Sequence, residues 1–127
     1  MNKLLIDASE TTPFVCLDME NGIMEVTGRS VPENAQKFYN SILTWIEEYS
    51  LEPFTVTELN FYLYYFNTSS SKIIFDVMKK IQKIHDEGKT TAQINWCYED
   101  DDSDMLEAGE QLQLMLHIPF NLKIIKV

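Results

Sequence analysis

The sequence predicts a single-domain α/β fold in which helices pack on a mixed β-sheet. Its 127 residues fall in the ordinary range of one domain, and 45% hydrophobic with 24% charged residues is a typical globular mixture. Short β-like segments fill the first third of the chain. Segments with helical periodicity then alternate with further β-like segments, which favours a mixed sheet covered mainly by helices. The predicted order is βββαβαβαβ, within one domain spanning residues 1–127.

Three short strands are predicted at the start of the chain, at residues 4–8, 14–19 and 23–27. Asn21 and Gly22 separate the second strand from the third. An Asn-Gly pair between apolar segments favours a hairpin, because both residues tolerate positive φ. We therefore expect two of these strands to pair antiparallel.

A first helix is predicted after residue 34. Apolar residues recur there at intervals of three and four, at Ala35, Phe38, Ile42, Trp45 and Ile46. Pro32 suits a first helical turn, and Glu33 places negative charge at the positive end of the helix dipole. Ser30 and Glu33 also have the spacing of a capping box, but Val31 precedes a proline and is biased away from helical angles. The sequence therefore leaves the capping residue open.

The second half of the chain alternates strands and helices. Residues 54–66 are rich in β-branched and aromatic side chains and predict a long, largely buried central strand, with one face formed by Thr57, Leu59, Phe61, Leu63 and Tyr65. A helix follows, with apolar positions from Ile73 to Ile84 and an end near Gly88. The remaining predicted elements are a strand at 90–98, a helix at 103–116 and a strand at 122–127.

Charge and cysteine content narrow the classes of partner. The net charge of -10 repels nucleic-acid phosphates and anionic lipids, and Arg29 is the only arginine, so nucleic-acid and membrane partners are not expected. Cys16 and Cys97 are too few for a disulfide framework, and there is neither a signal-peptide pattern nor an apolar run of membrane-spanning length. We expect a cytoplasmic protein that binds proteins or small molecules.

The segment from Asn67 to Lys72 contains four consecutive hydroxyl residues where a strand must become a helix. One hydroxyl would suffice as an N-cap, so four in a row favour a function beyond capping. A phosphate here would carry about -1.5 to -2 charges at the positive end of the helix dipole, which the fold tolerates. A partner packed against the same surface would be expelled.

Catalysis is an alternative use of these serines. A small hydrolase would use Ser69 or Ser70 as nucleophile, with Lys72 or a distant histidine, His85 or His117, as base. The chain has no nucleophile elbow and no phosphate-cradling glycine loop.

The acidic residues 99–104 resemble a metal-binding loop only in composition. Met105 and Gln111 stand where a calcium loop needs a glycine and a bidentate glutamate. We therefore predict a solvated loop that caps the third helix through Asp102 or Ser103, and no metal site. Arg29 is predicted to hold Glu33 or this loop, or to contact a partner. Aromatic side chains predicted to be core or half-buried, rather than a binding platform, are Trp45, Tyr62, Tyr64, Trp96 and Tyr98.

Three separated motifs resemble the SiaC family of bacterial regulatory phosphoproteins. They are Gly28-Arg29-Ser30-x-Pro32-Glu33-Asn34, Tyr65-Phe66-Asn67-Thr68-Ser69-Ser70-Ser71-Lys72 and Trp96-x-Tyr98-Glu99-x-Asp101-Asp102-x-Asp104-Met105-x-Glu107-x-Gly109-Glu110. They occur in the right order, and the resemblance extends from Thr12 to Phe120.

The resemblance implies a STAS-like fold, similar to anti-sigma factor antagonists, and a partner-switching role without catalysis or cofactor. In the family a dedicated kinase phosphorylates the threonine of the Asn-Thr-Ser-Ser-Ser motif, which is Thr68 here. We take Ser69 and Ser70 as fallback acceptors. A metal-dependent PP2C-type phosphatase reverses the reaction. The unphosphorylated form binds its target, in one branch a diguanylate cyclase that it activates, so that cyclic di-GMP output and biofilm behaviour follow the phosphorylation state.

The same resemblance gives a set of expected partner-contacting residues on the three motifs. These are Arg29, Pro32, Glu33, Asn34, Asn67, Ser69, Ser70, Ser71, Lys72, Asp101 and Asp104. A third hypothesis, a constitutive adaptor, predicts neither phosphate nor competing partners.

Overall fold

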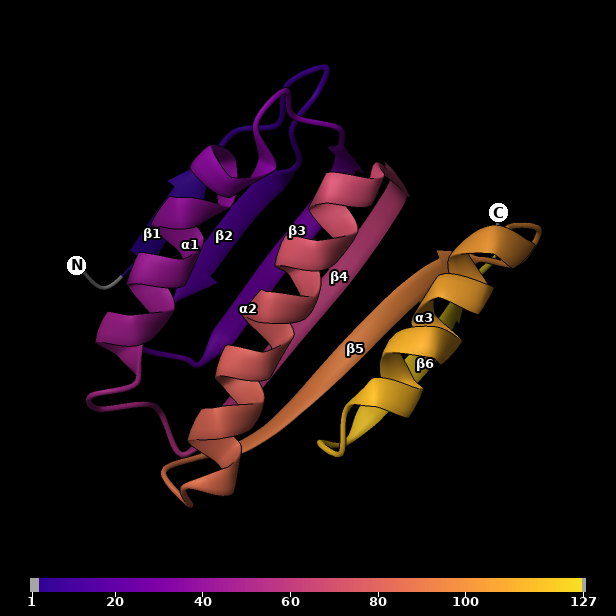
Figure 1. The fold of residues 1–127 in the computed structure, drawn as a ribbon. Coiled ribbons are helices and arrows are strands. Elements are labelled where there is room, and N and C mark those ends of the chain that lie inside the picture. Colours follow the sequence, from indigo (N-terminus) through magenta and orange to yellow (C-terminus); the bar gives the residue numbers. More distant parts are fainter. Residues whose placement is uncertain (1–2, 127) are drawn as a thin grey trace.

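The structure is a computed structural model that describes residues 3–126, and its elements follow the predicted order (Figure 1). They are β1 (Lys3–Ile6), β2 (Phe14–Asp18), β3 (Ile23–Ser30), α1 (Ala35–Tyr49), β4 (Val56–Phe66), α2 (Thr68–Asp86), β5 (Thr91–Glu99), α3 (Ser103–Met115) and β6 (Phe120–Ile125). Val127, the predicted end of the last strand, lies outside the described residues. No helix within the described range has the length and hydropathy needed to cross a membrane.

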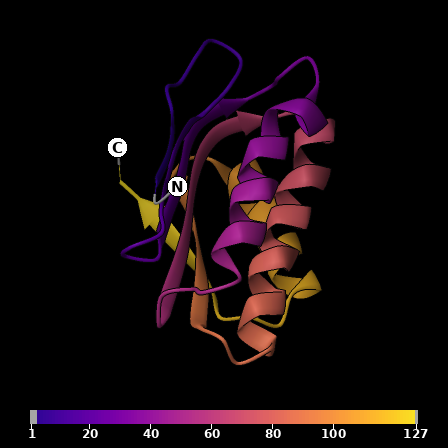
Figure 2. The same cartoon turned by 90° about the vertical axis from the view of Figure 1, so that its left-hand side faces the viewer.

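All six strands form one mixed sheet in sequential order, from β1 to β6. β1, β2 and β3 pair antiparallel, whereas β3, β4, β5 and β6 are parallel to one another. Each parallel connection moves one strand along in the same direction and contains one helix. Since such crossovers are right-handed, all three helices lie on one face of the sheet. The turned view in Figure 2 shows this, so the predicted mixed sheet is confirmed, with its helices on one side only.

The hairpin between β2 and β3 is confirmed, but its turn depends on one residue of the Asn-Gly pair. Gly22 has a φ of 67°, and no residue other than glycine has positive φ in the described range. The Gly22 amide donates to the Asp18 carbonyl at 3.0 Å. A Cβ at Gly22 would lie 2.3 Å from the Val56 carbonyl oxygen, so the close approach of β4 also requires glycine.

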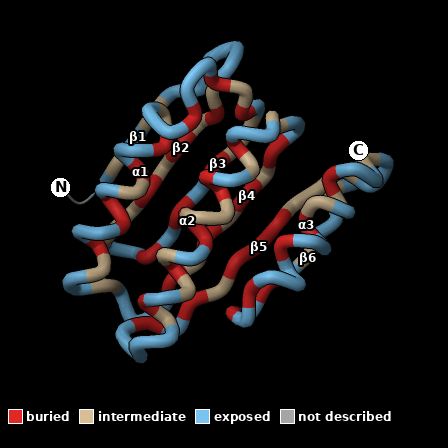
Figure 3. Tube along the Cα trace, viewed as in Figure 1, coloured by how far each residue is buried: buried red, intermediate tan, exposed pale blue. Residues whose placement is uncertain are grey.

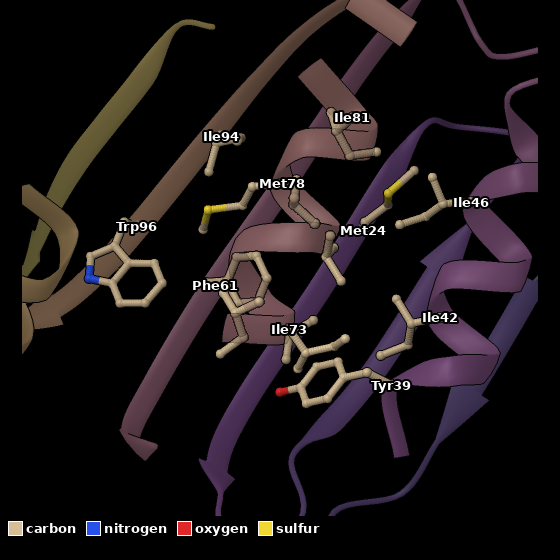
Figure 4. Packing of buried hydrophobic residues seen from close by; sticks show 14 of the residues in the cluster. Met24, Tyr39, Ile42, Ile46, Phe61, Ile73, Met78, Ile81, Ile94 and Trp96 are labelled. Carbon is tan, nitrogen blue, oxygen red and sulfur yellow. The ribbon is translucent and has the colours of Figure 1, made fainter. Parts of the chain in front are cut away.

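The hydrophobic core lies between the sheet and the helix layer (Figures 3 and 4). Central strand β4 directs alternate residues into it, and Thr57, Leu59, Phe61 and Leu63 are buried as predicted. The opposite face of β4 is only half-buried, as at Asn60 and Tyr62. The expectation of a largely buried strand was therefore wrong for that face, because no helix covers it. The buried side chains labelled in Figure 4 are Met24, Tyr39, Ile42, Ile46, Phe61, Ile73, Met78, Ile81, Ile94 and Trp96.

A β-bulge changes the alternation near the end of β4. Gly28 pairs with Leu63 and Arg29 with Tyr65, so Tyr64 is an extra residue between the two pairs. Tyr64 and Tyr65 are consequently 52% and 53% exposed, rather than half-buried and aligned with Leu63 as the alternation predicts. The other core or half-buried predictions for aromatic residues are confirmed, at Trp45, Trp96, Tyr62 and Tyr98.

Candidate functional site

The three motif segments meet at one edge of the sheet. Parallel strands end on the same edge, and β3, β4 and β5 end at Ser30, Phe66 and Glu99. The motif residues at these ends are 29–34, 67–72 and 100–104. They comprise the end of β3, the connections to α1, α2 and α3, and the first turns of α2 and α3 (Figure 1). We call this region the carboxyl edge.

Helix α2 begins with an asparagine cap rather than with a hydroxyl cap. Asn67 is extended, with a φ of -88° and a ψ of 173°, and its Oδ1 accepts the backbone amide of Ser70 at 3.0 Å. Its own amide donates to the carbonyl of Ser30 at 3.1 Å, which ties the helix start to the end of β3. The cap is therefore Asn67, and none of the four hydroxyls serves as the N-cap. Thr68 to Ser71 instead form the first turn of the helix.

The four hydroxyls of this turn have different surroundings. Ser71 Oγ donates to the Thr68 carbonyl at 2.7 Å, and the Ser69 hydroxyl lies at the surface and donates to Asn67 Oδ1 at 3.2 Å. Ser70 is fully buried. The Thr68 side chain is exposed, and its hydroxyl has no hydrogen-bond partner among residues 3–126. The first turn thus presents Thr68 to solvent with an unoccupied hydroxyl.

Ser70 belongs to a chain of buried hydroxyl groups. Ser70 Oγ donates to the Ser30 carbonyl at 3.0 Å, and Ser30 Oγ donates to Ser70 Oγ at 2.9 Å. Because the Ser30 proton is used there, the Tyr39 hydroxyl, 2.7 Å from Ser30 Oγ, must be the donor in that contact. This chain joins β3, α1 and α2. It removes Ser70 from the surface, so Ser70 as a fallback phosphate acceptor or as a partner contact is wrong for this folded state.

The alkaline stability of the protein should depend on Tyr39. Burial raises the pKa of Tyr39 to about 12, whereas an unfolded tyrosine titrates near pH 10. Between these values the unfolded state binds fewer protons, so rising pH should favour unfolding. We expect wild type to lose about 1 kcal/mol more unfolding free energy than Tyr39→Phe between about pH 9 and pH 11. Urea titrations followed by circular dichroism measure this difference.

A matched control for this experiment is Tyr64→Phe, which removes an exposed phenol. Its stability should fall with pH in the same way as that of wild type. Parallel curves for wild type and Tyr39→Phe would contradict the assignment of the alkaline loss to Tyr39.

Helix α1 begins later than the capping-box spacing predicts. Its N-cap is Asn34, whose Oδ1 accepts the amide of Lys37 at 3.1 Å. Ser30 ends β3, so no Ser30–Glu33 capping box forms. Pro32 precedes the helix and is buried, which makes both its placement in the first turn and its role as a partner contact wrong. The buried proline anchors the loop, while Glu33 and Asn34 remain exposed.

A polar hollow of about 420 Å³ lies between the first turns of α1 and α2. Glu33 and Asn34 line it from one side, and Ser69 and Lys72 line it from the other. The structure thus brings together four of the residues predicted as partner contacts. Arg29 does not line this hollow, and its guanidinium lies 5.8 Å from the ring centroid of Tyr65, a cation–π contact. Within the described residues Arg29 forms no ion pair, so the predicted contact with Glu33 or the acidic loop is wrong.

The acidic loop caps α3, as expected. Asp102 is the N-cap, and its Oδ1 accepts the amide of Met105 at 3.0 Å. Of the two predicted capping residues, Asp102 is therefore the one that caps the helix, and Ser103 is its first residue. Asp104 lies in the first turn and lines a second hollow of about 340 Å³ together with Tyr64 and Tyr65. Asp101 is exposed and lines none of these hollows. Among the described residues, no group of three His, Cys, Asp or Glu side chains is arranged to hold a metal ion.

No histidine lies beside these serines, and Lys72 lines the same hollow as Ser69 without a hydrogen bond to it within the described residues. His85 accepts the backbone amide of Ala92 through Nδ1, about 25 Å along α2 from Thr68 at 1.5 Å per residue. His117 contacts the carboxylate of Asp86 at the same end of the helix. Across residues 3–126, no histidine or lysine is hydrogen-bonded to a serine of the segment. None of these serines is therefore paired with a base in the way that activates a nucleophile.

Sequence reasoning missed one part of this edge. Tyr64 and Tyr65 are exposed there because of the β-bulge, which leaves no reliable mark in a run of aromatic residues. It also missed exposed apolar side chains on α3, where Leu114 and Met115 are 87% and 58% exposed. The signal for these was present, because consecutive apolar residues at 114–116 occupy more than one face of a helix.

Comparisons with known proteins agree with this architecture. The profile described as SiaC family regulatory phosphoprotein matches residues 6–125. An uncharacterized protein of Pseudomonas aeruginosa (strain UCBPP-PA14) is 27% identical over 120 residues, which are 94% of each chain. The structure of SiaC of Pseudomonas aeruginosa is 26% identical, has a TM-score of 0.89, and covers 98% of this chain and 100% of that one. The same TM-score, at 25% identity over 96% and 99% of the two chains, is found for a crystal structure of the diguanylate cyclase SiaD in complex with its activator SiaC from Pseudomonas aeruginosa.

Proposed function

This chain belongs to the SiaC family of regulatory phosphoproteins, and we propose that it is a non-enzymatic switch operated by phosphorylation of Thr68. The unphosphorylated form binds and controls a target protein. A cognate kinase phosphorylates Thr68 and thereby releases the target, and a PP2C-type phosphatase restores binding. The relative SiaC occurs in a complex with a diguanylate cyclase as its activator, so the target class that we propose is a diguanylate cyclase.

The main observation behind the proposal is the accessibility of the Thr68 hydroxyl. It is exposed on the first residue of a 19-residue helix and has no hydrogen-bond partner within the described residues. A kinase can reach it without unfolding the helix start, which Asn67 and Ser70 hold in place. Ser69 is the remaining fallback acceptor, since its hydroxyl also lies at the surface.

The electrostatics of the start of α2 supports a phosphate on Thr68 that weakens partner binding without destabilising the fold. The first backbone amides of α2 have no acceptor within the helix, and the helix dipole favours negative charge at this end. Lys72, one turn further along, provides a cation on the exposed surface. A doubly charged phosphate is therefore tolerated by the protein itself. In a complex with the target, however, the phosphate would be buried in the interface without an opposite charge to pair with, which weakens binding.

The contact surface that we propose is the exposed part of the carboxyl edge. Pro32 and Ser70 do not belong to it, because both are buried. Its members, from the three segments, are Arg29, Glu33, Asn34, Asn67, Ser69, Ser71, Lys72, Asp101 and Asp104. Tyr64 and Tyr65 extend the surface, and exposed aromatic side chains of this kind often anchor protein interfaces.

Mapping of the phosphate on protein purified from growing cells tests the acceptor. The full chain is tagged and expressed in its own organism, and phosphopeptides are analysed by mass spectrometry. We expect the phosphate on Thr68, complete loss of it in Thr68→Val, and normal phosphorylation in the neighbouring control Ser69→Ala. Phosphate found only outside residues 67–72 would overturn the proposal, and the lack of any phosphate under all growth conditions would favour a constitutive adaptor.

A further inference from the structure

We propose that three exposed lysines of α2 form the surface by which the kinase recognises this chain. They are Lys72, Lys79 and Lys83, and we call them the lysine strip. The inference rests on the proposed function, because it names the surface that the kinase of Thr68 contacts. The matching surface of the kinase is anionic, with the phosphates of MgATP beside Thr68 and an acidic segment further along the helix.

The lysine strip is aligned with the phosphate acceptor. Thr68, Lys72, Lys79 and Lys83 stand at i, i+4, i+11 and i+15, and therefore on one face of α2. All four side chains are exposed. In Figure 1, α2 lies in the middle of the helix layer, between α1 and α3, and its buried residues face the sheet. The strip is therefore on the outer side of the helix, where a partner can contact it together with Thr68.

The lysine strip is a basic region on an acidic protein. Helix α2 carries a net charge of +2, from four lysines and two aspartates, in a chain of net charge -10, so the other residues together carry -12. Among residues 3–126, no lysine of the strip forms an ion pair. The Lys79 ammonium lies over the ring of Phe75, 5.3 Å from its centroid. The positive charges of the strip are thus available to a partner.

Helix stability accounts for only one of the three lysines. Lys83 lies in the last turn of α2, where the helix dipole favours a cation. Lys72 lies near the opposite end, at the start of the second turn, where the dipole opposes a positive charge. Lys79 lies between them, away from both ends. The position of these charges therefore fits contact with a partner better than stabilisation of the helix.

Two lysines of the strip line a hollow that has room for acidic side chains. The hollow measures about 370 Å³ and lies between α1 and α2. Lys79, Lys80 and Lys83 line it, and Asp76 is the only acidic residue among its described lining. Three of its lining residues also line the polar hollow at the first turns of α1 and α2, so the two hollows adjoin. An acidic segment bound between the helices would therefore extend from the strip towards the phosphorylated turn.

Phosphoryl transfer requires an anion to approach Thr68. The γ-phosphoryl group leaves ATP for Thr68 Oγ, the hydroxyl proton passes to a base of the kinase, and ADP departs. The oxygens of the transferred group are negatively charged, and a protein of net charge -10 repels them unless cations lie nearby. Helical side chains lean towards the N-terminus, so Lys72 reaches back towards Thr68, one turn before it. Lys72 is thus placed to contact the phosphates of ATP.

The other two lysines are too far from Thr68 to contact ATP. Lys79 and Lys83 lie about 16 and 22 Å further along the helix, at 1.5 Å per residue. Their partner is the kinase itself, through an acidic segment that pairs with them. The strip should therefore have two separable effects, on the transfer step through Lys72 and on the affinity for the kinase through Lys79 and Lys83.

Initial rates of Thr68 modification test the lysine strip. The tagged full chain is added at increasing concentration to a clarified extract of its own organism, with ATPγS as phosphoryl donor because phosphatases remove thiophosphate slowly. Thiophosphate on Thr68 is quantified by mass spectrometry. We expect Lys79→Glu/Lys83→Glu to raise KM about tenfold at a nearly unchanged maximal rate, because repulsion replaces two attractive contacts. Lys72→Gln should lower the maximal rate about tenfold, and Lys72→Arg, which keeps the charge, should restore most of it.

A matched control separates the strip from net charge. Lys123→Glu/Lys126→Glu makes the same change of charge at two exposed positions near the end of the chain, one on β6 and one just after it. We expect this variant to be modified with the KM of wild type. Added salt should reduce the difference between the two double variants, because it screens exposed charges. Equal KM values for the two double variants would overturn the proposal, since net charge alone would then explain the effect.

The proposed function and the lysine strip fail in different ways. If wild type gains no thiophosphate on Thr68, the proposed function is wrong, and the strip with it. If wild type is modified on Thr68 and Lys79→Glu/Lys83→Glu is modified equally well, the switch survives and the strip proposal is wrong. If the same double variant loses affinity for the target as strongly as it raises KM, the strip belongs to the target-binding surface and its assignment to the kinase is overturned.

Discussion

Replacement of Thr68 by aspartate is expected to lower the affinity for the target by about 100-fold or more, because a like-charged or unpaired contact in an interface costs several kcal/mol. The same change should leave the fold at least as stable. The carboxylate lies on the first residue of α2, where the helix dipole favours negative charge by about 0.3–1 kcal/mol. Binding and stability should therefore respond in opposite directions. Titration calorimetry with the purified target and urea unfolding measure the two quantities.

Two control variants show whether the added negative charge causes the loss of target affinity. Thr68→Asn has nearly the shape of Thr68→Asp but no charge, and should bind the target almost as well as wild type. Ser41→Asp adds the same charge to an exposed site of α1 and should also bind normally. An equal loss of affinity in Thr68→Asn and Thr68→Asp would contradict the electrostatic mechanism, because shape alone would then explain the effect.

Gly109→Ala is expected to destabilise the fold by about 1–3 kcal/mol, the usual cost of overpacking. A Cβ at this position would lie 2.4 Å from Trp96 Cδ1 and 2.8 Å from Leu122 Cδ2. Trp96 cannot easily move away, since it is fully buried and its Nε1 donates to the Met105 carbonyl. Helix α3 must therefore lift from β5 and β6. The expected sign is opposite to that of helix propensity, which favours alanine over glycine by about 1 kcal/mol.

Urea unfolding followed by tryptophan fluorescence measures this loss. Glu110→Ala is the matched control, because residue 110 is the exposed neighbour on the same helix. It should change the free energy of unfolding by about 0.5 kcal/mol or less, the usual range for a surface site. A Gly109→Ala variant as stable as wild type would show that α3 is not held against the sheet as closely as described.

The order of elements was predictable from the sequence because each element had its own periodic signal. Leu59, Phe61 and Leu63 alternate as a strand should, and apolar residues from Ile73 to Ile84 repeat as in a helix. The one-sided helix layer was not predicted. It follows from the sequential pairing of β3 to β6, which is a property of tertiary packing that the sequence pattern does not encode.

The candidate site was predictable in its location but not in the roles of its residues. Four hydroxyls at a strand-to-helix junction marked the segment that forms the first turn of α2 at the carboxyl edge. Burial then separated them, because Ser70 joins the hydroxyl chain through Ser30 and Tyr39 whereas Thr68 remains exposed. Pro32 was misplaced for a different reason. Its fixed φ suits an extended loop residue as well as the first residue of a helix, so the sequence does not distinguish the two positions.

The distribution of phosphate between the bound and free protein shows whether phosphorylation of Thr68 releases the target. The tagged full chain is purified from its own cells, complexes are separated from free protein by size exclusion, and Thr68 phosphate is quantified in both fractions by mass spectrometry. We expect phosphate on the free protein and almost none on the complexed protein. Equal phosphate occupancy of Thr68 in the two fractions would contradict it.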